Sequence, residues 1–276
     1  MVQRADRFRL RVATACITAS LLAACTTSPM NSPPSPATVA ELAPSGTLRA
    51  AINFGNPVLA ARDSVTSEPR GVSVDLSREL ARRLGVPLEL VTYTAAGKVV
   101  EAVKSNAWDV AFVAIDPVRG TDLDQTAPYL IIEGIYAVPQ TSPIRTNSEV
   151  DRTGVRVVVA TGSAYDLYLT RELKQAQLVR VPTSAVVVDT MVSGTYEAAA
   201  GVRQQLDADA KRAPNVRLLD GRFMVIGQAM ALPKGRPAGA RYLGAFVESV
   251  KASGFVAEAL KRNGIGGAAV APRATN

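Results

Sequence analysis

The turn at Gly162 and Ser163 could bind an anion. It follows the apolar run Val155–Ala160 and precedes a helical pattern that starts at Ala164. Backbone N–H groups at a helix start attract negative charge, and glycine has no Cβ to block a ligand. An ordinary strand-to-helix turn capped by Ser163 explains the same residues equally well. The turn, with Thr161 before it, is therefore a candidate that local sequence alone does not decide.

Arg119 is the second candidate, and it follows Pro117 in a predicted turn. A planar guanidinium offers two parallel N–H donors to a carboxylate, and inside a closed cleft this pairing is charge-assisted and poorly screened. The alternative is a solvated arginine in a surface turn. Asp116 could accept a ligand ammonium group, or it could pair with Arg119 and partly neutralise it.

Several kinds of catalysis are excluded by composition. The sequence has no histidine and only two cysteines, Cys16 and Cys25. This excludes Ser-His-Asp and Cys-His mechanisms and most imidazole-ligated metal sites. No phosphate-binding loop pattern occurs, and the C-terminal glycines lack the strand-turn-helix context of a dinucleotide loop. We expect no cofactor and no metal, whereas carboxylate or lysine catalysis stays open.

The N-terminus has the pattern of an export signal. A short apolar stretch, Val12–Ala24, follows four basic residues: Arg4, Arg7, Arg9 and Arg11. It is too short to span a bilayer, so residues 1–24 are predicted to be a secretory signal peptide. Leu22-Ala-Ala-Cys25 resembles the bacterial lipobox, in which the cysteine receives a diacylglycerol that anchors the protein to a membrane. The alternative is ordinary cleavage nearby. With Cys25 lipidated, no second thiol is left for a disulfide.

Residues 25–45 are predicted to be the lipidated cysteine and a flexible tether. Thr26–Pro44 combines five prolines with Ser, Thr and Asn, which favours an extended chain. Loss of residues 1–24 removes four arginines and one aspartate and lowers the net charge from +7 to +4. The remaining arginines are scattered without interleaved aromatic residues, so we expect no nucleic-acid partner.

From Gly46 onward, strand and helix patterns alternate. Leucines and valines four residues apart predict a helix over 72–84, which Gly85 ends. Strands are predicted at 47–52, 86–91, 109–113 and 131–138, and again at 155–160, 178–181, 198–202 and 224–232. Helices are predicted at 164–173, 185–192, 203–212, 242–252 and 255–262, with a further helix around Val99–Val103. Strands separated by helices indicate parallel sheets, and the two similar series indicate two α/β lobes.

Short motifs in a fixed order resemble the extracellular solute-binding proteins of the polar amino-acid type, family 3, which serve ATP-driven importers. They cover nearly everything from Gly46 to Ile265: Gly46-Thr-Leu-Arg49, Gly71-Val-Ser-Val-Asp-Leu76, Ala107-Trp-Asp-Val-Ala111, Arg119, Ala127-Pro-Tyr129, Thr161-Gly-Ser163 and Gly194-Thr-Tyr-Glu-Ala198. Each motif is weak alone, whereas their order and spacing make a strong combined signal.

The resemblance implies a periplasmic-binding-protein type II fold, with two α/β lobes joined by a two-strand hinge. Lobe one would comprise residues 46–137 and 228–276, and lobe two residues 138–227. The hinge would lie near Ala137-Val138 and Gly227–Ala231. Ligand would sit between the lobes and close them, which is a known kind of switching motion.

The same resemblance assigns roles to the candidate residues. Arg119 aligns with the family arginine that grips the α-carboxylate of the ligand, and Gly162 and Ser163 would hold the same anion. Glu197 stands where the family usually carries an aspartate that binds the α-ammonium group. It could equally be the start of a surface strand.

Some residues depart from the family pattern. The loop from Asp109 to Arg119 is shorter than usual, and Asp116 replaces a common threonine. The loop Asn53-Phe-Gly-Asn-Pro57 lacks the usual aromatic-rich segment, so Asn53 and Phe54 are the candidates there, with Phe54 as an apolar wall. Trp108 is expected to be core packing.

The expected function is the substrate-binding component of an ABC importer, a non-enzyme that captures an amino acid or related carboxylate. Expected partners are the small ligand, an ABC permease and, through the lipid, the membrane on the periplasmic side of a bacterium. The protein is expected to be a monomer. Because the same fold hosts cyclohexadienyl dehydratases, the alternative is a periplasmic lyase, with Arg119 holding substrate and Glu197 or Asp116 as the acid.

Overall fold

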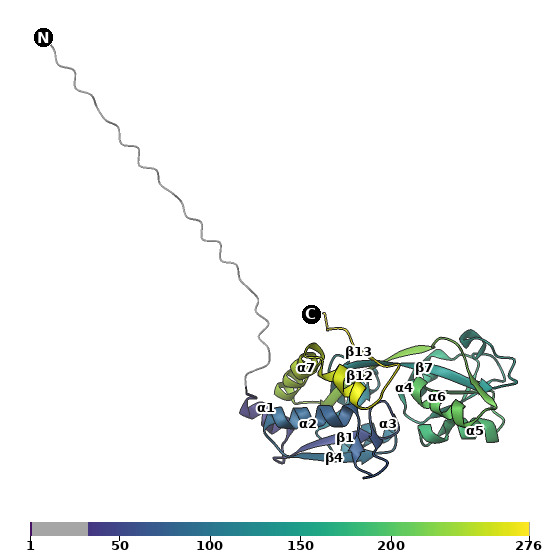
Figure 1. Cartoon of the computed structure of the whole chain (residues 1–276), viewed down its shortest axis with the longest axis horizontal. Helices are drawn as coiled ribbons and strands as arrows, with labels where there is room; N and C mark the ends of the chain where they lie inside the picture. Colours follow the sequence, from purple (N-terminus) through teal and green to yellow (C-terminus); the bar gives the residue numbers. More distant parts are fainter. Residues whose placement is uncertain (2–32, 276) are drawn as a thin grey trace.

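The computed structural model describes Met1 and residues 33–275. The rest of the predicted signal peptide and the predicted lipidation of Cys25 lie outside the described residues. Figure 1 shows two α/β lobes side by side, with β7 and β12 running between them. The strand order in the large sheet is β4-β1-β5-β12-β7-β10-β8-β9, so one continuous set of hydrogen-bonded strands joins the lobes.

Lobe one is built on three parallel strands, with β1 in the middle: β4 (Leu88–Tyr93), β1 (Leu48–Asn53) and β5 (Val110–Ala114). β5 is buried throughout its length, which is typical of a parallel strand covered on both faces. The helices of lobe one are α1 (Pro36–Leu42), α2 (Val72–Leu84), α3 (Ala96–Glu101), α7 (Pro237–Ala252) and α8 (Phe255–Arg262).

Helix α2 shows how the predicted periodicity becomes packing. Val72, Leu76 and Leu80 recur every four residues, so they share one face of the helix, and all three are fully buried. Gly85 ends the helix with φ 70°, a left-handed conformation that glycine adopts without steric cost. The predicted bounds of this helix are confirmed.

Lobe two repeats the plan with β10, β8 and β9 in parallel. Its strands are β8 (Arg156–Ala160), β9 (Gln177–Val181), β10 (Ala198–Val202) and β11 (Val216–Leu218), and its helices are α4 (Ala164–Glu172), α5 (Val187–Ser193) and α6 (Arg203–Arg212). The predicted strand 198–202 and helix 203–212 match β10 and α6.

Two long antiparallel strands cross between the lobes: β7 (Leu130–Pro139) and β12 (Met224–Pro233). They pair with each other over Leu130–Gly134 and Met224–Gln228. β12 then pairs with β5 of lobe one, and β7 pairs with β10 of lobe two from Gly134 onward. The two-strand hinge and the fold class are confirmed, although β7 joins lobe two before the predicted Ala137-Val138.

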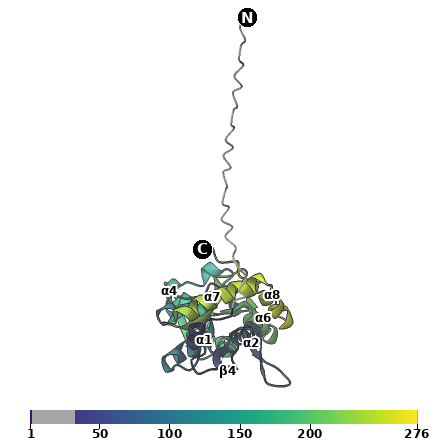
Figure 2. The ribbon, with the colours of Figure 1, turned by 90° about the vertical axis from the view of Figure 1, so that its left-hand side faces the viewer.

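Helix α1 lies inside the segment predicted to be a flexible tether. Ser35 caps it by accepting a hydrogen bond from the Thr38 amide at 3.1 Å, and Pro36 occupies its first turn. Leu42 is fully buried, and Glu41 accepts a hydrogen bond from the Gly239 amide of α7 at 2.7 Å. Figure 2 shows α1 with α7 and α2 at one end of lobe one. The prediction is therefore wrong for residues 36–42, because one buried leucine and a cap outweigh the Pro- and Ser-rich composition.

The remaining elements are short, and no periodic pattern marks them in the sequence. The strands are β2 (Ala61–Arg62), β3 (Pro69–Arg70), β6 (Leu123–Gln125) and β13 (Ala269–Val270), and the 3-10 turns are Ala102–Ser105, Arg119–Thr121, Asn147–Glu149 and Ser184–Val186. Trp108 is fully buried in lobe one and donates its indole N–H to Val99 O at 2.9 Å, a packing role as expected. Among the described helices, none combines the length and apolar character of a membrane span.

Candidate ligand-binding cleft

One cavity lies where strands from both lobes end. Its lining includes the last residue of two strands in each lobe: Asn53 of β1, Ala114 of β5, Ala160 of β8 and Val202 of β10. The carboxyl ends of parallel strands are where open α/β sheets place their ligands, because the loops that follow them leave a crevice. The cavity is therefore an interlobe site formed by the fold itself.

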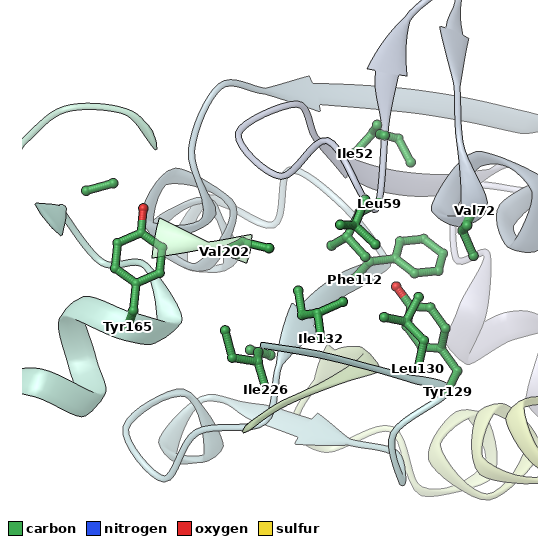
Figure 3. Close-up of a cluster of buried hydrophobic side chains, with 14 of the residues drawn as sticks. Ile52, Leu59, Val72, Phe112, Tyr129, Leu130, Ile132, Tyr165, Val202 and Ile226 are labelled. Carbon is green, nitrogen blue, oxygen red and sulfur yellow. The ribbon is translucent and has the colours of Figure 1, made fainter. Parts of the chain in front are cut away.

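The cavity is small and mixed in character. Its volume is about 30 Å³, which by the same measure gives room for two or three water molecules. The apolar wall is formed by Leu59, Phe112, Tyr165, Val202 and Ile226. In the view of Figure 3, Val202 and Ile226 lie between Tyr165 and Phe112. Polar groups come from Asn56, Ser184 and Gln228, among others.

Arg119 lines this cavity and is 2% exposed. Its guanidinium donates to Ala114 O in its own lobe at 3.0 Å and to Gly162 O in lobe two at 2.9 Å. Its Nε is buried and has no partner in the described part of the chain. Desolvation lowers the pKa of Arg119 to about 10, and the nearby Asp116 charge opposes that shift. The site therefore holds a buried cation that joins the two lobes.

The turn Thr161–Ser163 contacts Arg119 through Gly162 O, and Thr161 and Ser163 line the cavity. Ser163 caps α4 by accepting from the Asp166 amide at 3.0 Å. The Gly162 amide donates to Asp166 Oδ2 at 2.8 Å, so it is not free to hold an anion. Gly162 has φ 68°, and a Cβ there would lie 2.8 Å from Gly97 Cα of lobe one. This close approach of two backbones requires glycine at position 162.

Asp116 lies beside the cavity without lining it. It is 4% exposed and pairs with Arg171 of α4 at 2.9 Å, and it also accepts from the Val118 amide at 2.8 Å. Its ion-pair partner is not Arg119, which was one of the two alternatives considered from sequence, and acceptance of a ligand ammonium group stays a prediction. The partner is an arginine of lobe two, so Asp116 forms an ion pair between the lobes.

Besides Asp116 and Gly162, two further predicted residues do not line the cavity. Glu197 precedes β10, at the opposite end of that strand from Val202, and pairs with Arg156 at 2.7 Å. It lines a separate surface pocket with Tyr196 and Asn215. Phe54 packs against the core, with the guanidinium of Arg62 4.5 Å from its ring centroid. Asn53 does line the cavity, and its side chain accepts from the Gly55 amide at 2.8 Å.

Sequence reasoning missed several lining residues, and two of them carried a signal. Gln228 is a polar residue inside the apolar run of β12, is 3% exposed, and has a buried Oε1 without a partner among the described residues. Val202 is the last residue of a predicted parallel strand, which places it at the ligand edge. Within the same described residues, no group of three His, Cys, Asp or Glu side chains could hold a metal ion.

Comparisons with known proteins agree on one type of molecule. The family model of bacterial extracellular solute-binding proteins, family 3, matches residues 48–264. The solute receptor for L-cysteine of Neisseria gonorrhoeae superposes with a TM-score of 0.71 at 22% identity, covering 82% of this chain and 92% of that one. A search of curated protein sequences finds no match.

Two further solved structures show the same fold. The ancestral amino acid-binding protein AncCDT-1, a precursor of cyclohexadienyl dehydratase, gives a TM-score of 0.69 at 22% identity over 82% of this chain and 98% of that one. A binding component of an ABC transporter from Wolinella succinogenes, complexed with lysine, gives a TM-score of 0.68 at 22% identity. The superposition covers 79% of this chain and 95% of that one. These likenesses show the type II periplasmic-binding-protein architecture.

Proposed function

We propose that this chain, which belongs to the bacterial extracellular solute-binding proteins of family 3, captures a small polar solute between its lobes and delivers it to the permease of an ABC importer. The observation that carries the proposal is the position of Arg119. It is a buried cation in a cavity where four strand ends from two lobes meet, and it already bonds to both lobes. An anionic group of the solute would find there a guanidinium in a water-poor site, where charge-assisted pairing is strong.

The place of action follows from the family and from the N-terminal sequence. A family of extracellular solute-binding proteins acts on the outer side of the cytoplasmic membrane. We propose that Cys25 is lipidated and anchors the chain on the periplasmic side, because it follows the apolar stretch in a lipobox-like pattern. The proposed partners are the small solute and the permease, with the protein acting as a monomer.

A periplasmic lyase is the second candidate, because one structural relative is a precursor of cyclohexadienyl dehydratase. Such a lyase needs an acid at the substrate. The two acids proposed for it are engaged elsewhere, since Asp116 pairs with Arg171 and Glu197 pairs with Arg156 outside the cavity. This favours binding over turnover.

The test is a thermal-shift screen of the purified protein against amino acids and small organic acids, with a parallel assay for prephenate turnover. A saturable stabilisation by one solute class without turnover is the expected result. Turnover would replace binding by catalysis, and the absence of any ligand from the whole panel would refute capture of a small polar solute.

Arg119 is tested by Arg119→Ala and Arg119→Lys, with Arg82→Ala as the control. Arg82 lies in the same lobe with its side chain 70% exposed. Both Arg119 variants should lose the ligand-induced shift, the lysine variant because it lacks the bidentate fork. Ligand binding that persists in a folded Arg119→Ala variant would refute the role of Arg119.

A further inference from the structure

The charge inventory of the cavity is one-sided. Among the described residues that line it, Arg119 is the sole charged side chain, and the polar remainder consists of amides and hydroxyls. The adjoining groove, which shares Ala95 and Thr161 with the cavity, carries Lys98 and Glu101, so its charges balance. The groove therefore has no net negative charge that would offset the cation of Arg119 in the cavity.

The carboxylates nearest to the cavity are already used by the protein. Asp116 accepts from Arg171 at 2.9 Å and from the Val118 amide at 2.8 Å. Asp166 accepts from the Gly162 amide at 2.8 Å with one oxygen and from Arg180 at 2.9 Å with the other. An ammonium group that approached either carboxylate would therefore compete with an arginine for it.

At Val202 and Ile226, the lobe-two edge of the cavity is apolar and offers no negative charge to a ligand ammonium group. Val202 ends β10, is 8% exposed and lines the cavity, and Ile226 of β12 lines it as well. In the view of Figure 3 both side chains lie on the same side of Phe112. A charged group placed against this wall would lose its hydration without gaining a partner, which is costly.

Arg119 has the opposite requirement. Its two bonded nitrogens reach only neutral carbonyl oxygens, and its buried Nε reaches no acceptor among the described residues. Burial lowers its pKa to about 10, which means that the surroundings disfavour its charge. A carboxylate in the cavity adds to the favourable charge of Asp116 and supplies an acceptor for Nε, whereas an ammonium group adds a second cation.

We infer that the cavity selects a small carboxylate that carries no ammonium group, such as a hydroxy acid or an oxo acid, over the amino acid of the same shape. This inference rests on the proposed function and narrows it to one solute class. It follows from the single buried arginine, the engaged state of the neighbouring carboxylates and the apolar edge at Val202 and Ile226.

The test uses matched pairs that differ only in hydroxyl against ammonium: lactate with alanine, malate with aspartate. Isothermal titration of the full chain should show, in whichever pair binds, a Kd at least about tenfold lower for the hydroxy acid, because the cavity lining offers an ammonium group only neutral acceptors, such as Gln228 Oε1, and no carboxylate. An amino acid that binds as tightly as its hydroxy acid would overturn the inference and leave the proposed function standing. If neither these pairs nor the wider panel bind, both fall.

A designed reversal sharpens the test. Val202→Asp places a carboxylate at the lobe-two edge and should shift the preference toward the amino acid by about tenfold or more. Val202→Asn has the same size without the charge and should produce no such shift. A folded Val202→Asp variant with unchanged preference would contradict the charge argument, and the matched pairs on the unaltered chain decide the inference even if this variant fails to fold.

Discussion

In each lobe, an arginine–carboxylate pair links the N-terminal ends of two neighbouring parallel strands. In lobe one, Asp109 accepts from the amide of Arg49 at 3.1 Å, from its Nε at 3.0 Å and from its Nη2 at 2.8 Å. In lobe two, Glu197 accepts from the same three groups of Arg156 at 2.8, 2.9 and 2.7 Å. Each arginine also donates to a nearby backbone carbonyl. In both lobes an arginine near the start of one strand is thus held by the carboxylate that precedes its neighbour.

We call the Arg49–Asp109 pair the lobe-one clamp and the Arg156–Glu197 pair the lobe-two clamp. The two clamps differ in burial. Asp109 is fully buried and also lies 3.4 Å from a second arginine, Arg236, whereas the side chain of Glu197 is 33% exposed and has one arginine. The two pairs have the same geometry but contribute differently to the free energy of unfolding. A buried carboxylate depends on its partners far more than one that water can reach. The comparison also explains Glu197: it is the lobe-two counterpart of Asp109, at the strand end opposite to the cavity.

The largest expected effect is on lobe one. Asp109→Ala leaves Arg49 and Arg236 without their shared buried partner, and we expect a loss of about 3–5 kcal/mol in unfolding free energy. Urea denaturation measures it, with the exposed Glu68→Ala as the control. A loss below about 1 kcal/mol would show that burial does not separate the two clamps.

An ion pair between the lobes gives the next effect. Asp116→Asn removes the charge that holds Arg171 across the cleft, so the closed form should become less populated. Because a ligand that binds the closed form loses affinity in proportion to that population, we expect about a fivefold weaker Kd. Titration calorimetry measures the affinity. Small-angle X-ray scattering without ligand should show a larger radius of gyration than that of the unaltered protein.

Arg171→Ala is the matched control for this pair, since it breaks the same contact from lobe two. The two variants should weaken binding similarly, and Arg171→Ala should also lower the urea midpoint, because it leaves the buried Asp116 carboxylate without its ion-pair partner. A drop in stability without any change in affinity would show that the pair supports folding and not closure.

The sequence predicted elements well where one pattern, a period or an unbroken apolar or polar run, covers a whole segment. Helix 72–84, strand 198–202 and helix 203–212 coincide with α2, β10 and α6. It failed on α1, where a single buried residue, Leu42, decides, and on short strands such as β13 that a tertiary partner creates. Periodicity reports one-sided burial over several turns, so elements fixed by one contact leave no pattern to detect.

For the cleft, the types and the order of residues identified candidates, whereas the contacts between them could not be predicted from the sequence. Four candidates line the cavity, namely Arg119, Asn53, Thr161 and Ser163, and their contact with a ligand stays a prediction. Which acceptor takes the Gly162 amide, and which arginine pairs with Asp116, depend on side chains far apart in the chain. Glu197 shows this, because it stands before a buried strand just as Asp109 does, and the pairing with an arginine that this match implies was not among the predictions.

The lobe-two clamp should be the weaker one. We expect Glu197→Ala to cost about 0.5–1 kcal/mol in unfolding free energy, because the pair with Arg156 is partly solvated and screened by salt. Ligand affinity should stay within about twofold of the unaltered protein, since Glu197 does not line the cavity. A Kd that rises in step with that of the Arg119 variants would mean that Glu197 acts on the ligand after all.

The smallest expected effect is a pH dependence confined to the same carboxylate. Hydrogen bonding from Arg156 lowers the pKa of Glu197 below its ordinary 4.5 in the folded protein. The unfolded chain therefore takes up the proton first, so the contribution of the pair is complete above about pH 5.5 and is lost as the pH falls through 4.5 and below the lowered pKa. Glu197→Gln cannot titrate, so its stability deficit relative to the unaltered protein should shrink between pH 6 and pH 3. Urea midpoints for both proteins measure that difference, and a deficit that stays constant over this range would show that the lobe-two clamp does not depend on the charge of Glu197.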